Sequence, residues 1–423
     1  MNSALEIAII ADDLTGAADA GVQFCPYLGP IYMTGGKKKD FNSADLRSKG
    51  LSVFTNTRNI DPAQAADTIY EITRIVHNLS PRMIYKKIDS CLRGNLGSEL
   101  DAMVSALHAT ASFVAPAFPE HGRTTVNDFH LIDGIQVNET EIGRDPLSPV
   151  TESRLSVLLS SQSQMSIGHI PLCYIEKGSI ALYKQVKKLL AQGCNHIVFD
   201  AQKTRHLNAI ASLARSQFDN VLLVGSAGLA RSLARLTGSK YTAQTARNRP
   251  RLQKYLFVCG SASLVLARQA KLLADSTGWP WIVLDPEALT ANKNSTRYES
   301  LKTELESSWR TGNLIISIAQ SLDTDMKKRP EEIVAGLADV VDSLLSLNVP
   351  DALFLSGGDT AENVMYKING SAILLHEEIL PGLMRGEIAG DILKGVTVFT
   401  KPGAFGQPDA LVKLVQQTFE NKV

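Results

Sequence analysis

Cysteine is scarce in this chain of 423 residues, and the few that occur lie far apart. The five cysteines are Cys25, Cys91, Cys173, Cys194 and Cys259. Their number is odd and no C-x-x-C pair occurs, which excludes a disulfide framework and a zinc knuckle. We therefore expect small, buried, reduced thiols and a reducing compartment.

The chain also lacks long apolar runs and an excess of charge of either sign. No stretch approaches the roughly 18 apolar residues of a membrane span, and MNSALEIAIIADD has no basic segment of the kind that opens a secretory signal. Lys plus Arg and Asp plus Glu each number 43, so the net charge is zero. This balance argues against nucleic acid or a membrane as the main partner. We expect a cytoplasmic protein with small-molecule partners, and a local basic site for a small anion is compatible with that.

Several sequence motifs that are typical of known enzyme and nucleotide-binding classes are absent. The chain has no G-x-x-x-x-G-K-[ST] phosphate loop and no G-x-G-x-x-G dinucleotide motif. It also has no G-x-S-x-G turn, and the sequence His376-Glu377-Glu378 lacks the second histidine of a zinc helix. The sequence therefore does not predict a Walker-type NTPase, a dinucleotide-binding fold, an α/β-hydrolase or a zinc enzyme.

What the sequence contains instead is an alternation of short apolar runs with longer segments of helical spacing. In the first half the runs lie at 6–13, 51–57, 83–90, 112–119, 196–202 and 220–228. In the second half they lie at 254–263, 281–286, 313–319, 351–361, 372–378 and 395–406. Segment 61–79 is typical of an intervening helix, with Pro62 in its first turn. The alternation predicts an α/β fold with largely parallel sheets.

A polar, basic stretch at 238–255 has no apolar period and interrupts this alternation. We interpret it as an interdomain linker, and a chain of this length can bury two cores. The predicted domains are residues 1–238 and 254–423, joined by a linker at 239–253. Segment 120–180 is less regular, and we expect an insertion or a lid there.

Polar residues gather where strands of the predicted first domain end, and parallel sheets bind ligands beyond those carboxyl ends. Asp12, Asp13 and Thr15 follow the first apolar run, where a helix begins and offers free amides to an anion. Adjacent carboxylates can bind hydroxyls, act as a general base or hold Mg²⁺. The alternative interpretation is that they only cap the helix.

The second cluster is the stretch YKKIDSCLRGNLGSEL at 85–100. Arg93 has the planar fork that suits a carboxylate, and Gly94 lets the backbone come close to a ligand. Lys86 and Lys87 alternate along a strand, so at most one of them faces the site. We expect Arg58, after the run at 51–57, to converge here, although a solvated charged loop is the alternative. The other polar members of this cluster are Asp89 and Ser90.

Glycine-rich turns follow three strands of the predicted second domain. They are CGSAS at 259–263, SGGDT at 356–360 and KPGAFG at 401–406. Glycine frees backbone amides to bind phosphate, and the hydroxyl of Thr360 and a helix N-terminus add donors. Asp359 is a candidate ligand for Mg²⁺. One such turn can be purely structural, but three in one domain predict a nucleotide site.

Six motifs together carry a more specific signal. IADDLTGAADAG, KKIDSCLRGN, APAFPEHGRTT, VGSAGLA, SGGDTAENV and KPGAFG occur in this order. The chain thereby resembles the four-carbon acid sugar kinase family along nearly its whole length. The resemblance implies ATP-dependent phosphorylation of D-threonate, D-erythronate or 3-oxo-tetronate, with a sugar-acid-binding N-terminal and a nucleotide-binding C-terminal domain. The sequence at 87–91, KIDSC, is more similar to the threonate or erythronate branch.

The resemblance also implies roles for individual residues. It implies ATP contacts at Ser261, Gly357, Gly358, Asp359, Thr360 and Gly403, and leaves open whether Ser261 or Ser263 touches phosphate. It implies that the sugar acid lies near Asp12, Asp13, Arg58, Lys87, Asp89, Ser90 and Arg93.

For the reaction we expect ATP with Mg²⁺, and a general base that takes the proton of the terminal 4-hydroxyl. Asp13 is the favoured base and Asp89 the alternative. We expect the two sheets to face each other across an interdomain cleft that closes over the substrates. A non-catalytic sensor of sugar acids or nucleotides, and a Schiff-base enzyme using Lys87, are the competing interpretations. A homodimer is compatible with the sequence.

Overall fold

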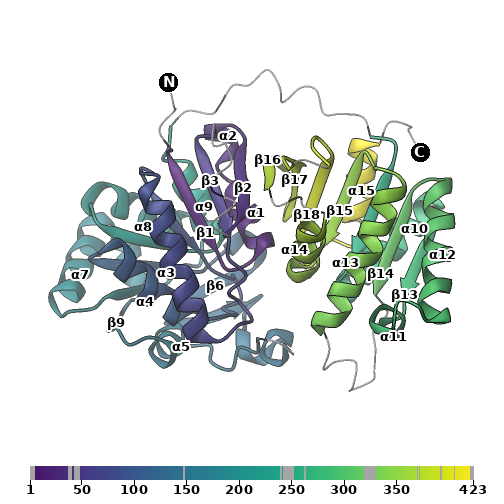
Figure 1. Ribbon diagram of the computed structural model, residues 1–423. Coiled ribbons are helices and arrows are strands. Elements are labelled where there is room, and N and C mark those ends of the chain that lie inside the picture. Colours follow the sequence, from purple (N-terminus) through teal and green to yellow (C-terminus); the bar gives the residue numbers. More distant parts are fainter. Residues whose placement is uncertain are drawn as a thin grey trace. The chain divides into compact units, whose positions relative to one another are not determined.

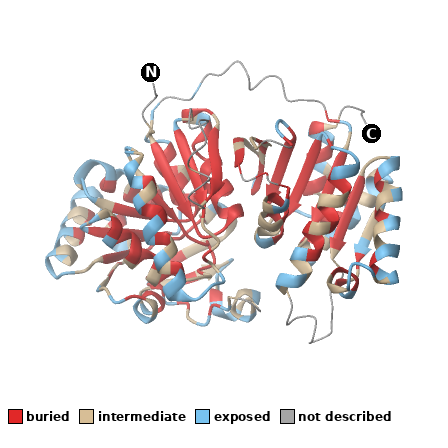
Figure 2. Ribbon diagram, viewed as in Figure 1, coloured by how far each residue is buried: buried red, intermediate tan, exposed pale blue. Residues whose placement is uncertain are grey.

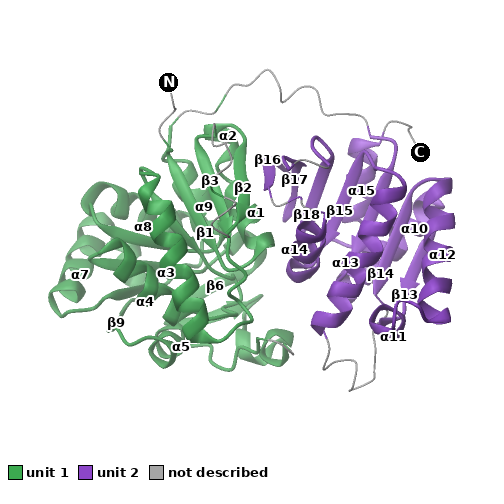
Figure 3. Ribbon diagram, viewed as in Figure 1, with its two compact units in different colours: residues 1–241 green, residues 242–423 purple. Residues whose placement is uncertain are grey.

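The computed structural model describes residues 5–36, 41, 48–145, 148–238, 241, 252–261, 263–318, 330–368, 370, 372–390, 393–403 and 405–419. The chain divides into two compact units, 1–241 and 242–423 (Figure 1; Figure 3). Each unit alternates strands with helices, so the predicted α/β fold class is confirmed. Most of the predicted linker, 239–253, falls outside the described residues. Leu252, near its end, is buried, and its amide donates to the carbonyl of Thr418.

Unit 1 is built on a parallel sheet. Its strands lie in the order β2 (Ile31–Gly35), β3 (Gly50–Phe54), β1 (Ile7–Ala11), β4 (Ile84–Lys87), β11 (Val221–Gly225), β5 (Ala111–Ala115), β10 (His196–Phe199) and β9 (Ile167–Ile170). Each strand is parallel to its neighbours. Strands β1, β3, β5 and β10 are buried along their whole length (Figure 2), as expected for a parallel sheet covered on both faces.

Two groups of helices pack against this sheet. One group contains α1 (Leu14–Val22), α8 (Thr204–Gln217) and α9 (Ala227–Ala234), and the other contains α3 (Pro62–Asn78), α4 (Leu96–Leu107) and α5 (Leu155–Gln162). The shorter α2 (Cys25–Leu28), with α6 (Leu172–Glu176) and α7 (Ser179–Ala191), completes the unit. Helix α3 confirms the helix predicted at 61–79, and the side chain of Asp61 caps it through the amides of Ala63 and Gln64.

The less regular segment 120–180 contains a small antiparallel sheet of β6 (Arg123–Val126), β7 (Phe129–Ile132) and β8 (Ile135–Gln136). Asn127 and Asp128 join β6 to β7 with positive φ angles of 49° and 74°, as a tight two-residue hairpin turn requires. Asp200, fully buried after β10, accepts hydrogen bonds from both of their amides at 2.8 and 3.0 Å. A buried carboxylate therefore ties the inserted sheet to the parallel one.

Unit 2 has a mixed sheet. Its strands lie in the order β13 (Trp281–Leu284), β14 (Leu314–Ile318), β12 (Tyr255–Cys259), β15 (Ala352–Ser356), β18 (Thr397–Lys401), β17 (Leu383–Ile388) and β16 (Ala372–Leu380). The strands from β13 to β18 are parallel, whereas β17 runs antiparallel to both β18 and β16. The run predicted at 372–378 is therefore a strand, but it belongs to an antiparallel hairpin.

An aromatic core holds unit 2 together. Tyr255, Phe257, Phe354 and Phe399 are fully buried on neighbouring strands, and Trp279 packs against the first two. Helices α10 (Leu264–Thr277) and α15 (Ala410–Thr418) pack together, as do α11 (Pro286–Thr290), α12 (Thr296–Thr311), α13 (Pro330–Leu347) and α14 (Gly358–Lys367). Among the helices of both units that the structure describes, none is long and apolar enough to cross a membrane.

Candidate functional site

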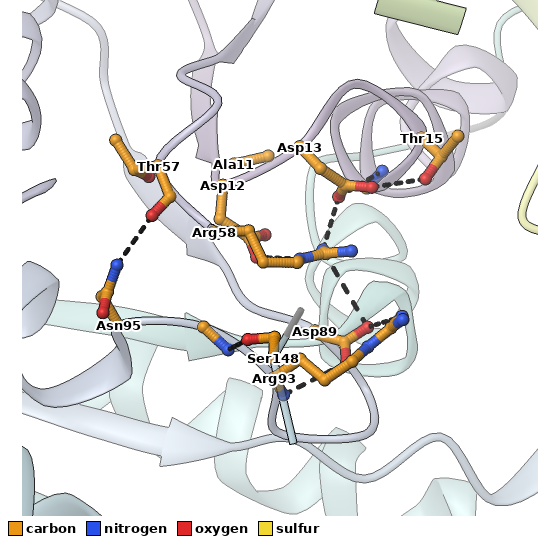
Figure 4. Close-up of polar contacts among 12 residues, drawn as sticks. Ala11, Asp12, Asp13, Thr15, Thr57, Arg58, Asp89, Arg93, Asn95 and Ser148 are labelled. Carbon is orange, nitrogen blue, oxygen red and sulfur yellow. Dashed lines mark hydrogen bonds and ion pairs between the residues drawn. The ribbon is translucent and has the colours of Figure 1, made fainter. Parts of the chain in front are cut away.

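Three neighbouring strands of unit 1 end at one edge of the sheet. Ala11 at the end of β1 pairs with Phe54 at the end of β3 and with Lys87 at the end of β4. Because these strands are parallel, the residues that follow them emerge side by side. Figure 4 shows Asp12, Asp13, Arg58 and Asp89 meeting there. The convergence of Arg58 with the two predicted clusters follows from this register.

Arg58 lies at the centre of the cluster. Its Nε donates to Asp12 Oδ2 at 2.6 Å and its Nη2 donates to Asp13 Oδ1 at 2.7 Å, while Asp89 Oδ1 lies 3.9 Å from Nη2 (Figure 4). Burial alone would lower the pKa of Arg58, but the three carboxylates raise it well above its usual value. The guanidinium therefore stays charged and fixes three carboxylates relative to one another.

The carboxylate of Asp89 accepts several hydrogen bonds. Its Oδ2 accepts from Arg93 Nε at 2.8 Å and from the amides of Arg93 and Cys91, and its Oδ1 accepts from Arg93 Nη2 at 3.2 Å. Burial alone would raise the pKa of Asp89, but the charges of Arg93 and Arg58 hold it well below its usual range. Such a carboxylate stays ionised and is a weak general base.

These contacts occupy the donors of Arg93. Its Nε and Nη2 are taken by Asp89, and its Nη1 donates to Asp145 Oδ2 at 3.3 Å. The predicted bidentate binding of a substrate carboxylate therefore requires this fork to leave Asp89. Gly94, next along the chain, has φ +96° and donates its amide to Ser148 Oγ at 3.1 Å, so the turn is closed by a second segment.

Asp13 both caps a helix and belongs to the cluster. Its Oδ1 accepts the amide of Gly16 at 3.0 Å, and its Oδ2 accepts the hydroxyl of Thr15 at 2.5 Å. The side chain of Lys87 is buried and lies against Gly16, where a Cβ would come within 3.0 Å of its Nζ. The capping interpretation of Asp13 is thus confirmed, and its contact with Arg58 leaves the site interpretation open as a prediction.

The turn at 89–94 is also held from the inserted sheet. His130 on β7 is fully buried; its Nε2 lies 2.8 Å from the carbonyl of Ser90, and its Nδ1 lies 3.0 Å from Thr125 Oγ1. Burial lowers the pKa of His130 to about 4, so the ring is neutral at pH 7. A neutral ring donates through Nε2 to the carbonyl and accepts through Nδ1 from the hydroxyl. Sequence reasoning did not identify His130, because a lone histidine carries no pattern.

A buried ion pair underlies the cluster and was also missed. Lys86 is fully buried, and its Nζ lies 2.5 Å from Glu99 Oε2 on α4. Burial raises the pKa of Glu99. Burial would also raise the pKa of Asp12, but Arg58, with help from Lys86 and Lys87, lowers it. The alternation of side chains along β4 thus sends Lys86 to Glu99 and Lys87 toward Asp13, as the sequence predicted for opposite faces.

Unit 2 repeats the same geometry with glycine turns. Cys259, Ser356 and Lys401 end the neighbouring parallel strands β12, β15 and β18, and Ser356 pairs with both of the others. A Cβ on Gly260 would overlap Thr360 Oγ1, and a Cβ on Gly403 would overlap Ser261 Oγ. Only glycine fits at these two positions, because the three turns lie against one another.

The turns of unit 2 fit a phosphate group. Gly357 has φ +101°, and helix α14 starts directly after it, so the first amides of α14 lie at the glycine turns. Gly358 and Asp359 form its first turn, and Asp359 is exposed. In the described parts of both units, no group of three or more His, Cys, Asp or Glu residues could hold a metal ion. Mg²⁺ bound with a nucleotide needs only one or two carboxylates, so Asp359 alone is compatible with it.

One unit thus carries a carboxylate–arginine cluster and the other carries glycine turns beside a helix N-terminus, as in a protein that binds a polar small molecule and a phosphate compound. Residues 7–233 match a family described as a sugar-binding N-terminal domain, and residues 256–411 match a nucleotide-binding C-terminal domain. A D-threonate kinase of Cupriavidus necator is 30% identical over 98% of each chain. A D-erythronate kinase of Heliobacterium modesticaldum is 27% identical over 96% of this chain and 95% of its own.

The chain belongs to the four-carbon acid sugar kinase family, and the kinase class predicted from its motifs is confirmed. The relatives also include 3-oxo-tetronate kinases. A crystal structure of a Salmonella typhimurium protein matches with a TM-score of 0.81 at 21% identity, covering 98% of this chain and 100% of the other. That likeness supports the fold.

Replacing Lys86 by methionine should destabilise unit 1 by about 3–5 kcal/mol, because it leaves the carboxylate of Glu99 buried without its partner. The double variant K86M/E99Q should recover most of this loss, since no buried charge remains. Urea denaturation followed by circular dichroism measures both. Arg82 and Glu6 form an exposed pair at 3.3 Å, so R82M is the matched control, with an expected loss below about 1 kcal/mol. A K86M variant as stable as R82M would contradict the assigned buried pair.

Proposed function

We propose that this protein is an ATP-dependent kinase that phosphorylates the 4-hydroxyl of a four-carbon sugar acid, with D-threonate the first candidate and D-erythronate the second. The observation that carries the proposal is the grouping of Asp12, Asp13 and Asp89 around Arg58, within the part of the chain that matches a sugar-binding domain. The named activities of the full-length relatives support the substrate class.

The chemistry of the cluster suits a polyhydroxy acid. Sugar hydroxyls are donors, and carboxylates are strong acceptors for them. Asp12 Oδ1 is buried and has no hydrogen-bond partner among the described residues, so it has acceptor capacity to spare. Lys87 supplies a cation at the same place. Among the described residues, no carboxylate forms an ion pair with Lys87 as close as that between Arg58 and Asp12. We assign the binding of the substrate carboxylate to Lys87. Arg93 would also bind it if the guanidinium of Arg93 leaves Asp89.

We assign Asp13 as the general base. Asp89 is the weaker candidate because two arginines hold its pKa well below the usual range. Asp13 Oδ2 accepts the hydroxyl of Thr15 at 2.5 Å, and a carboxylate oxygen has a second lone pair that a substrate hydroxyl can use. The 4-hydroxyl would give its proton to Asp13 as its oxygen attacks the γ-phosphorus. Thr15 and Arg58 would hold the carboxylate in place during that step.

The nucleotide is assigned to unit 2. The glycine turns offer backbone amides and the start of α14, which suit phosphate oxygens. The residues of these turns that we assign to the nucleotide are Ser261, Gly357, Gly358, Thr360 and Gly403. Asp359 would help hold Mg²⁺, which with ATP neutralises charge on the β- and γ-phosphates. Transfer requires the γ-phosphate to meet the 4-hydroxyl, and we propose that substrate binding brings these two groups together. The predicted homodimer stays a prediction.

The Asp13→Asn variant should lower turnover by about 10²–10⁴-fold if Asp13 is the base, because an amide cannot accept the proton. The KM for ATP should stay unchanged, since ATP binds in the other unit. Steady-state kinetics with coupled ADP detection measures both quantities. Asp61 is the matched control, because it caps α3 as Asp13 caps α1; D61N should keep normal turnover. Turnover of D13N near that of the unmodified enzyme would remove Asp13 from this role.

A panel of four-carbon aldonic acids, incubated with ATP and Mg²⁺, tests the substrate. We expect ADP release and a 4-phosphate product with D-threonate above all and with D-erythronate next, detected by phosphorus NMR. Turnover only with 3-oxo-tetronate would move the protein to the other branch of the family. Nucleotide and sugar-acid binding without any product would make it a sensor and overturn the proposed activity.

A further inference from the structure

The turn that follows β18 is folded around a buried lysine. Lys401 has no exposed surface, and its Nζ donates to the carbonyls of Pro402, Gly403 and Phe405 at 2.9, 3.2 and 2.7 Å. An ammonium group has three hydrogens, so these three bonds use its whole donor capacity. The carbonyl oxygens of this turn therefore converge on one cation inside unit 2.

A second buried donor closes the same turn from the other side. Gln269 on α10 is fully buried, and its Nε2 lies 3.2, 3.2 and 2.8 Å from the carbonyls of Phe405, Gly406 and Gln407. Phe405 is thus shared by the lysine and the glutamine. Gly406, with φ +92°, makes the bend that brings these carbonyls inward. The path of the turn is set by two side chains rather than by a regular backbone ladder.

This turn carries Gly403 against Ser261. A Cβ on Gly403 would overlap the Ser261 hydroxyl, so any shift of the turn changes the spacing of these two residues. Both belong to the glycine turns assigned to the nucleotide. Lys401 contacts Gly403 through the carbonyl of that residue, and the turn takes all three of its donors, so none is left for a ligand.

The charge of Lys401 is not balanced by a carboxylate among the described residues. Among the described residues, the titratable group that acts on the pKa of Lys401 is Cys259 on the neighbouring strand β12. Burial raises the pKa of that thiol to about 12, so the thiol is neutral. Burial lowers the pKa of Lys401 to about 8. A buried cation held only by carbonyl dipoles is costly by itself, and an anion nearby offsets part of that cost.

We propose that Lys401 is a positioning residue for nucleotide phosphates: it shapes the turn that places Gly403 beside Ser261, and its uncompensated positive charge favours a polyphosphate there. This inference rests on the proposed nucleotide site of unit 2. A purely structural lysine would affect stability and leave the preference for charged over neutral ligands unchanged.

The test compares ATP with adenosine, which lacks phosphates. Isothermal titration calorimetry on the full-length Lys401→Met variant should show ATP binding weakened by about tenfold or more, because the turn loses the charged donor that shapes it and the site loses a nearby positive charge. Adenosine affinity and the KM for the sugar acid should not change. The control is K413M, which removes an exposed lysine on α15 paired with Asp409; it should bind ATP normally.

The pH dependence supplies a second readout that does not need a variant to fold. As the pH rises through about 8, Lys401 loses its proton, so the ATP affinity of the unmodified protein should fall, while adenosine affinity stays flat. A K401M variant that binds ATP as tightly as the unmodified protein, or an ATP affinity that does not fall across this range, overturns the inference and leaves the kinase assignment intact. If the unmodified protein binds no nucleotide at all, the proposed function itself fails.

Discussion

The bridging of three carboxylates by one guanidinium is the interaction on which the candidate sugar site depends. Asp12, Asp13 and Asp89 carry like charges within a space that Arg58 spans, and without a cation they would repel one another. Arg58 is mostly buried, with 13% of its side chain exposed, so its charge is screened little by water. Arginine suits this task because its planar fork donates in several fixed directions at once, which a lysine cannot do.

The two units share one arrangement of strand ends but place different residues there. In each, three adjacent parallel strands end in register, which brings loops distant in sequence to one place. Unit 1 fills that place with carboxylates and cations, whereas unit 2 fills it with glycines and a helix N-terminus. Acceptors suit the hydroxyls of a sugar acid, and amide donors suit phosphate. These side chains agree with the match of residues 7–233 to a sugar-binding domain and of residues 256–411 to a nucleotide-binding domain.

The sequence predicted much of this because the strands that carry the site are apolar runs ending in conspicuous residues. Strands β2, β9 and β17 and the small sheet β6–β8 were not predicted. In β9 and β17 polar residues interrupt the apolar run, His169 in β9 and Arg385 and Glu387 in β17. Contacts between distant segments were equally hidden, since nothing local links Lys86 to Glu99 or His130 to Ser90. For Arg93 the residue type was informative but the contact was not predicted. An arginine suggested binding of a substrate carboxylate, whereas in the structure its Nε and Nη2 donate to Asp89.

The most direct test of the account is the specificity constant, kcat/KM, for D-threonate in the Arg58→Lys variant. Lysine keeps the positive charge but cannot bridge Asp12 and Asp13 in the observed geometry. The account predicts a fall of about 10²-fold or more, in line with the cost of misplacing a reacting group, with an unchanged KM for ATP. A kcat/KM close to that of the unmodified enzyme would contradict the claim that the bridging guanidinium assembles the site.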